Sequence, residues 1–316
     1  MKSVSWINAE EVEERLDALT CTALMEKVIR DQEEGSVHQY LRNALVMPNG
    51  NVMASMPAYF EEGYFGMKAL SVYPHNSKDG YPSHQGAVLV FDETHGELRG
   101  MVDAASITKI RTGACSAAAS KVLARKESSV LALIGCGEQA WSHLYALVPV
   151  FPLEEVRVFD LSEKKAQDFA KKAQEETGIG VISCKSVEEA VNNADIICTL
   201  TPGTPAGYLK KEWIKEGAHI NAVGACSAGL RELESELVCA SSFYCDNVES
   251  LIHEAGDYLY PYHEGKIDES FVVGTIGEVL TRKKDGRTSP AEITVFESLG
   301  MAVEDLAAAA YLLKKE

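Results

Sequence analysis

The chain contains 316 residues, 46% of them hydrophobic, and its 47 acidic and 30 basic side chains give a net charge of −17. This length is typical of about two globular domains, and so acidic a surface repels the phosphates of nucleic acids and anionic lipids. No run approaches the roughly 18 apolar residues of a membrane span, and the first residues lack the apolar core of a signal peptide. We therefore expect neither nucleic acid nor membrane as a partner.

The first hundred residues predict a helix followed by a sheet. A single amphipathic helix is expected over residues 8–30, because apolar side chains recur on one side at Val12, Leu16, Leu19, Leu24 and Val28. Over residues 43–103, short apolar runs alternate with turn-forming segments rich in Gly, Asn and Asp. This pattern predicts a mostly antiparallel sheet, with strands at 67–73 and 87–91.

A long helix is then predicted over 105–125, and residues 113–120 in its middle are almost all small. Small side chains allow close packing, so we expect this helix at a domain junction.

From residue 129 onward, strand patterns alternate with helix patterns. Strands are expected at 130–134, 156–160, 180–183, 194–201, 220–224 and 243–246, with one helix over 162–176 and another opening at a capping box over 186–189. This alternation predicts an α/β fold with a Rossmann-type, doubly wound parallel sheet, beside a second α+β domain. We place the nucleotide-binding domain at 114–290. Residues 1–113 and 291–316 would form the substrate-binding and dimerisation domain, onto which a final helix over 300–313 packs.

The sequence after the strand at 130–134 matches a dinucleotide-binding turn. Gly135 allows a tight turn, Gly137 lets the backbone approach a pyrophosphate, and Ala140 permits close helix–strand packing. Glu138 and Gln139 open the helix whose free N–H groups would face the phosphates. We therefore expect the cofactor on residues 135–140.

Asp160 ends the next predicted strand. A carboxylate at this position accepts hydrogen bonds from both ribose hydroxyls and repels a 2′-phosphate. The sequence thus favours NAD over NADP.

The eight cysteines are scattered and form no CxxC pair. Such a pattern in a long chain indicates reduced thiols, a cytoplasmic location and no metal site.

Seven segments make the chain resemble the ornithine cyclodeaminase/mu-crystallin family nearly end to end. They are residues 56–59, 66–68, 82–85, 111–114, 135–140, 217–224 and 298–305. The resemblance implies a homodimer of two-domain subunits. It also implies hydride transfer between a nicotinamide and the α-carbon of a small α-amino, α-imino or cyclic ketimine acid.

The resemblance also implies site residues. Arg42 and Arg111 would hold the substrate carboxylate, and Lys68 would lie beside the α-nitrogen or the carboxylate. Either Lys68 or a bound water would supply the proton. Further cofactor contacts carry over to Ser83, Arg111, Thr112, Thr201, Val223, Gly224 and Ser298.

Two positions depart from the cyclodeaminase pattern. Ala54 replaces a Glu and Cys226 replaces an Asp, the two acids that handle the second amine of ornithine and the departing ammonia. We therefore expect an NAD-dependent imine reductase or amino-acid dehydrogenase. An ornithine cyclodeaminase and a nicotinamide-dependent binding protein of mu-crystallin type remain the alternatives.

Overall fold

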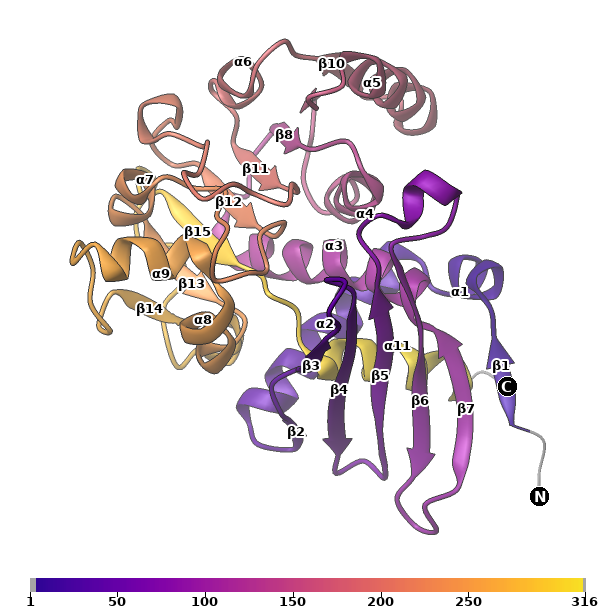
Figure 1. Ribbon diagram of the computed structural model, residues 1–316. Coiled ribbons are helices and arrows are strands. Elements are labelled where there is room, and N and C mark those ends of the chain that lie inside the picture. Colours follow the sequence, from indigo (N-terminus) through magenta and orange to yellow (C-terminus); the bar gives the residue numbers. More distant parts are fainter. Residues whose placement is uncertain (1–3, 315–316) are drawn as a thin grey trace. The chain divides into compact units, whose positions relative to one another are not determined.

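The computed structural model describes residues 4–314 and divides into two compact units (Figure 1). Unit 1 comprises Met1–Ala114 with Gly300–Glu316, and unit 2 comprises Cys115–Leu299. The chain first continues from unit 1 into unit 2 inside helix α3 (Ala104–Leu123), within the run of small residues in that helix. In the described part of the chain, no helix combines the length and apolar character needed to cross a bilayer.

Unit 1 contains a seven-stranded sheet with the order β1-β7-β6-β5-β4-β2, in which β3 also pairs with β4. The strands are β1 (Ser5–Ile7), β2 (Val37–Gln39), β3 (Asn43–Val46), β4 (Val52–Phe60), β5 (Tyr64–Val72), β6 (His84–Asp92) and β7 (Leu98–Asp103). Strands β2 to β7 pair antiparallel, which confirms the sheet predicted over 43–103, while β1 pairs parallel with β7.

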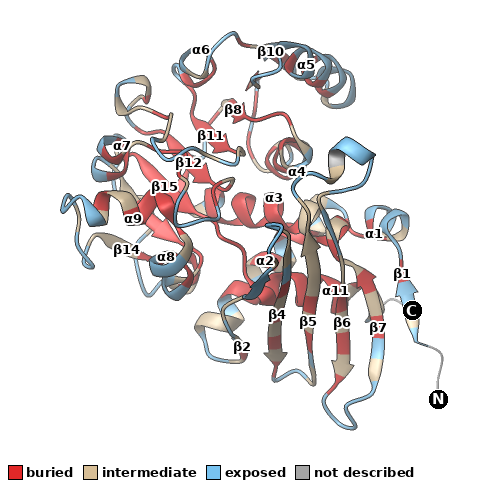
Figure 2. Cartoon of the chain, viewed as in Figure 1, coloured by how far each residue is buried: buried red, intermediate tan, exposed pale blue. Residues whose placement is uncertain are grey.

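The two faces of this sheet differ. One face packs against helix α11 (Ala302–Lys314), the predicted final helix, which is buried over most of its length (Figure 2). On this face, the β4 residues Ala54, Met56 and Ala58 are buried. The other, which we call the outer face, carries a cross-strand row of apolar side chains at Trp6, Met101, Leu89, Met67 and Pro57. All five are partly or largely exposed.

The single helix predicted over 8–30 is wrong. The structure has two helices, α1 (Ala9–Arg15) and α2 (Ala18–Glu33). Asp17 separates them, because its carboxylate accepts hydrogen bonds from the backbone N–H and the hydroxyl of Thr20, 2.8 and 2.6 Å away. Such a cap starts a new helix although the apolar spacing continues.

Unit 2 contains an eight-stranded sheet with the order β10-β9-β8-β11-β12-β15-β13-β14, in which every pairing is parallel. Its strands are β8 (Val130–Ile134), β9 (Glu155–Phe159), β10 (Gly180–Ser183), β11 (Ile196–Thr199), β12 (His219–Ala222), β13 (Ser242–Cys245), β14 (Val272–Thr275) and β15 (Thr294–Glu297). Its α-helices after α3 are α4 (Glu138–Leu147), α5 (Glu163–Thr177), α6 (Val187–Val191), α7 (Ser235–Cys239), α8 (Val248–Glu254), α9 (Gly256–His263) and α10 (Ile276–Leu280). The doubly wound parallel fold is confirmed.

Strand β15 changes the boundary expected near residue 290. It pairs with β12 and β13 inside the sheet, and all four of its residues are buried. Residues 291–299 therefore belong to unit 2 rather than to the unit that holds the last helix.

Candidate functional site

Unit 1 buries a lysine beneath helix α11. Lys68 lies in the middle of β5, opposite Met56 of β4 and Val88 of β6, and is only 4% exposed. Its Nζ donates a hydrogen bond to Oδ1 of Asp305 on α11, 3.0 Å away. The packed sheet face, not solvent, therefore surrounds this charge.

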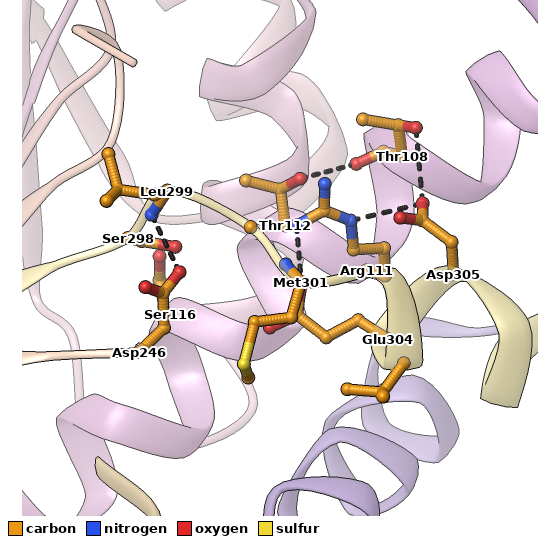
Figure 3. Close-up of polar contacts among 12 residues, drawn as sticks. Thr108, Arg111, Thr112, Ser116, Asp246, Ser298, Leu299, Met301, Glu304 and Asp305 are labelled. Atoms are coloured by element: carbon orange, nitrogen blue, oxygen red, sulfur yellow. Dashed lines mark hydrogen bonds and ion pairs between the residues drawn. The ribbon is translucent and has the colours of Figure 1, made fainter. Parts of the chain in front are cut away.

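Arg111 on α3 contacts Asp305 and also its neighbour Glu304. Its Nη1 donates to Oε2 of Glu304 at 2.6 Å, and its Nε forms an ion pair with Oδ1 of Asp305 at 3.4 Å (Figure 3). Both carboxylates have no exposed surface. Lys68 and Arg111, from different elements, thus converge on two adjacent acids at the start of α11.

Gly300 brings the second arginine to this cluster. Its φ is +81°, and a Cβ there would lie 2.8 Å from Nη1 and Nη2 of Arg111, so only glycine fits. The carbonyl of Gly300 accepts a hydrogen bond from Nη2 of Arg42 at 3.3 Å. The structure therefore brings the three cations predicted from the sequence together within unit 1.

The protonation of this cluster follows from its burial and charges. Burial lowers the pKa of Lys68; Asp305 opposes this shift, and Arg111 and Arg42 reinforce it. Burial alone would raise the pKa of Asp305, but Lys68 and Arg111 together lower it. A lysine with a lowered pKa is suited to proton transfer.

Glu304 and Asp305 were not among the site residues predicted from the sequence. The available signal was two adjacent acids in a helix that is otherwise almost entirely apolar, because buried acids need partners.

In unit 2, the turn between β8 and α4 has the geometry of a phosphate-binding loop. Gly135 has φ +102°, and a Cβ there would lie 2.9 Å from the carbonyl oxygen of Leu200. Gly137 caps α4 without a side-chain hydrogen bond, and a Cβ there would meet nothing within 4 Å. Glu138 is exposed, whereas the buried Oε1 of Gln139 has no hydrogen-bond partner in the described structure.

Asp160 follows β9 and lies against this turn. Its Oδ2 accepts from the backbone N–H of Cys136 at 3.0 Å, and its Oδ1 accepts from that of Ser162 at 2.9 Å. Nζ of Lys165 lies 3.2 Å from Oδ2. Burial opposes ionisation, but these hydrogen bonds and Lys165 lower the pKa of Asp160, so it is charged at neutral pH.

Glu232 joins the ends of β11 and β12. Its buried carboxylate accepts hydrogen bonds from the backbone N–H groups of Thr201 and Gly224 at 2.7 and 2.8 Å. The hydroxyls of Thr199, Thr201 and Tyr208 donate to it at 2.7 to 2.8 Å. Burial raises the pKa of Glu232, although the hydrogen bonds oppose the shift. Sequence reasoning missed this residue, because its partners become neighbours only when the sheet forms.

The other predicted cofactor contacts are divided between the two units. In unit 2, the buried Val223 follows β12, and the hydroxyl of Ser298, just after β15, is buried without a hydrogen-bond partner in the described structure. In unit 1, the Ser83 hydroxyl lies 2.9 Å from Nδ1 of His84, and the Thr112 hydroxyl donates to the Thr108 carbonyl at 2.7 Å.

The two positions that depart from the cyclodeaminase pattern differ in exposure. Ala54 is buried on the sheet face that carries Lys68. Cys226 is exposed in the loop after β12, where its Sγ lies 3.5 Å from the Val223 carbonyl oxygen.

The unit 2 residues fit a dinucleotide. The open space at Gly137, the N-terminus of α4 and the unpartnered groups of Gln139 and Ser298 lie at carboxyl ends of parallel strands, where doubly wound sheets bind ligands. The charged Asp160 completes this set.

Comparisons with known proteins cover nearly the whole chain. The model of the ornithine cyclodeaminase/mu-crystallin family matches residues 4–315. Mouse ketimine reductase mu-crystallin is 36% identical over 314 residues, 98% of this chain and 96% of the relative. The structure of Thermococcus litoralis Δ1-pyrroline-2-carboxylate reductase with NADH and L-proline has a TM-score of 0.94 and 32% identity, covering 98% of this chain and 96% of that one. An archaeal alanine dehydrogenase dimer with bound NAD has a TM-score of 0.93 and 34% identity, covering 98% and 95%.

Proposed function

Since this chain belongs to the ornithine cyclodeaminase/mu-crystallin family, we propose that it is an NAD(H)-dependent oxidoreductase acting on the C–N bond of a small α-amino or α-imino acid. The observation that carries the proposal is the buried cluster of Lys68 and Arg111 with Glu304 and Asp305. Buried charges are costly unless they are paired or used in function, and this set offers both a carboxylate anchor and a proton-transfer group.

In the reducing direction, Arg42 and Arg111 bind the substrate carboxylate, for which a guanidinium offers two parallel N–H groups. Lys68 lies beside the α-nitrogen and gives it the proton that the reduction consumes. When bound, NADH would supply the hydride for the α-carbon. In the oxidising direction, Lys68 takes the proton back.

Unit 2 would hold the cofactor. Residues 135–140 bind the pyrophosphate, with Gly135, Gly137, Glu138 and Gln139 at the turn, and Asp160 binds the ribose hydroxyls. The further cofactor contacts that the family resemblance implies are Ser83, Arg111, Thr112, Thr201, Val223, Gly224 and Ser298.

Ornithine cyclodeamination is the second candidate. Ala54 has no charge to bind the second amine of ornithine, and the Cys226 thiol is no substitute for a carboxylate. A binding protein without turnover would not need the buried lysine, so we place it third.

The test is a panel of substrates. Pyruvate or other 2-oxo acids with ammonia or methylamine, and the cyclic ketimine Δ1-pyrroline-2-carboxylate, are each mixed with enzyme and NADH. Loss of absorbance at 340 nm with at least one of them is expected. Ornithine with catalytic NAD, assayed for proline and ammonia, identifies a cyclodeaminase, and no turnover with any compound contradicts the enzymatic assignment.

We propose further that two copies pair through the outer face of the unit 1 sheet. The apolar row crosses five strands, and Phe65 and Phe91 stack on the same face with ring centroids 5.3 Å apart. Exposed apolar surface of this extent is typical of an interface, and the 34% identical alanine dehydrogenase is described as a dimer. Unit 1 would then serve substrate binding and dimerisation.

Light scattering after size exclusion tests this interface. Leu89→Glu places a charge in the middle of the row and is expected to give a monomer. Leu19→Glu, on the exposed side of α2, is the matched control and should leave the dimer intact. A dimeric Leu89→Glu variant would contradict the proposed face.

All eight cysteines are free thiols in the structure. Such thiols persist in a reducing compartment, so we propose that the enzyme acts in the cytoplasm.

A further inference from the structure

Asp305 contacts both Lys68 and Arg111, two of the residues proposed to act on the substrate. We propose that Asp305 is a positioning residue that holds the Lys68 side chain in its ammonium form and fixes the Arg111 guanidinium beside it. This inference rests on the proposed function, because it explains how the proton-transfer group of that site is kept ready.

The geometry centres on one oxygen atom. Oδ1 of Asp305 lies 3.0 Å from Nζ of Lys68. It also lies 3.4 Å from Nε of Arg111 and 3.4 Å from the Thr108 hydroxyl (Figure 3). These groups come from β5 and α3, and Asp305 itself comes from α11 and has no exposed surface. A single carboxylate oxygen therefore fixes both cations relative to each other.

The surrounding charges explain why a carboxylate is needed here. Burial, Arg111 and Arg42 all lower the pKa of Lys68, and Asp305 opposes them. Glu304 bonds to Arg111 instead. The nearby Cys21 thiol is buried, which raises its pKa and keeps it neutral. Asp305 is thus the acid in direct contact with Lys68, and without it Lys68 would lose its proton at a lower pH.

Loss of this charge has a defined kinetic signature. Reduction of an imine needs Lys68 protonated. The pH profile of kcat/KM should therefore have an alkaline limb, along which activity falls as Lys68 loses its proton. In Asp305→Asn, whose amide has nearly the same shape but no charge, this alkaline limb is expected about 1–3 pH units lower. Asp305→Glu, which restores the charge, should bring the limb back toward that of the wild type.

The neighbouring acid supplies the matched control. Glu304→Gln removes an equally buried carboxylate from the same helix, but one that bonds to Arg111 and not to Lys68. It is expected to raise KM for the substrate carboxylate while leaving the alkaline limb in place. A purely structural role for Asp305 would give both variants similar losses and an unchanged limb.

A direct titration separates this inference from the proposed function. In full-length protein labelled with ¹³C-lysine, the Lys68 Cε resonance is assigned by its absence in Lys68→Met and followed against pH. A downward shift in Asp305→Asn of about 1–3 units, absent in Glu304→Gln, is expected whether or not a substrate has been found. Identical Lys68 titrations in wild type and Asp305→Asn would overturn the proposal. If Asp305→Asn does not fold, as judged by circular dichroism, Asp305→Ser is tested with the same expected shift.

Discussion

Lys68 places an ammonium group in the middle of a sheet strand, under a helix, where an apolar side chain would pack without needing a partner. Replacing it with Met keeps the length of the side chain but removes the proton. We expect kcat/KM to fall about 10²–10⁴-fold, the usual contribution of a positioned acid or base. NADH binding, measured by fluorescence titration, should survive because the predicted phosphate loop lies in unit 2. Retained turnover would rule out the proton-transfer role.

Asp160 is expected to set the cofactor preference. Asp160→Asn keeps an acceptor for the Cys136 N–H but removes the charge that repels a 2′-phosphate, leaving Lys165 nearby as a cation. The ratio of kcat/KM for NADPH to that for NADH should rise at least about tenfold, equivalent to about 1.4 kcal/mol. Steady-state kinetics with both cofactors check this. Adding Lys165→Ala should remove part of the gain; an unchanged ratio in the single variant would mean that other residues select the cofactor.

At the same scale, the sequence revealed the residues whose role depends on local context. Gly135, Gly137 and Asp160 could be read because a strand, a turn and a second strand follow one another in the chain. Asp305 and Glu232 could not. Their partners are brought to them by tertiary structure, and Lys68 and Asp305 are 237 residues apart.

Among the elements, the ends of β11 and β12 depend on Glu232. In Glu232→Gln, the amide cannot accept all five hydrogen bonds, so buried donors lose their partner at a cost of about 1–3 kcal/mol. Since Thr201 and Gly224 are predicted cofactor contacts, we expect Kd for NADH to rise several-fold and the melting temperature to fall. Calorimetric titration measures the first, with the exposed Glu175→Gln as control. An unchanged Kd in a folded variant would show that these strand ends do not contribute to cofactor binding.

The type of most elements could be predicted, whereas some boundaries could not. Periodicity identified the parallel sheet and the final helix but joined α1 and α2, because it does not register the local hydrogen bonds of Asp17. Strand β15 was not predicted, although it has the same length as β10, β11, β12 and β13, which were. Its neighbours β12 and β13 identify it only in three dimensions.

For the whole molecule, the burial of histidines and of carboxylic acids makes the free energy of unfolding depend on pH. Burial lowers the pKa of His143 to about 4 and that of His219 to about 3. The unfolded chain binds these protons near pH 6.5, so their contribution to the free energy of unfolding falls as pH drops below about 6.5. Conversely, burial and the charge of Glu232 raise the pKa of Asp257 to about 8, and burial raises that of Glu297 well above its usual value.

These two acids act in the opposite direction. The folded protein keeps their protons where the unfolded chain releases them near pH 4, so their contribution to stability falls as pH rises. Glu297→Gln removes one such group, whose buried Oε2 has no hydrogen-bond partner in the described structure. Melting temperatures between pH 6.5 and 8.5 should decline less in this variant than in the wild type. Parallel declines, with Glu175→Gln as control, would indicate that Glu297 is already ionised.

The arrangement of the chain also has a consequence for its synthesis. Unit 2 is one continuous segment, whereas unit 1 lacks α11 until all of unit 2 has been translated. At a usual elongation rate of about 5–20 residues per second, Lys68 waits roughly 10–50 s for Asp305 to be made. Unit 2, although encoded later, therefore needs no segment beyond its own to complete its fold, whereas residues 4–114 need α11. A truncated protein that ends at Leu299 and has been released from the ribosome should already show protease resistance over Cys115–Leu299, while the earlier residues remain sensitive.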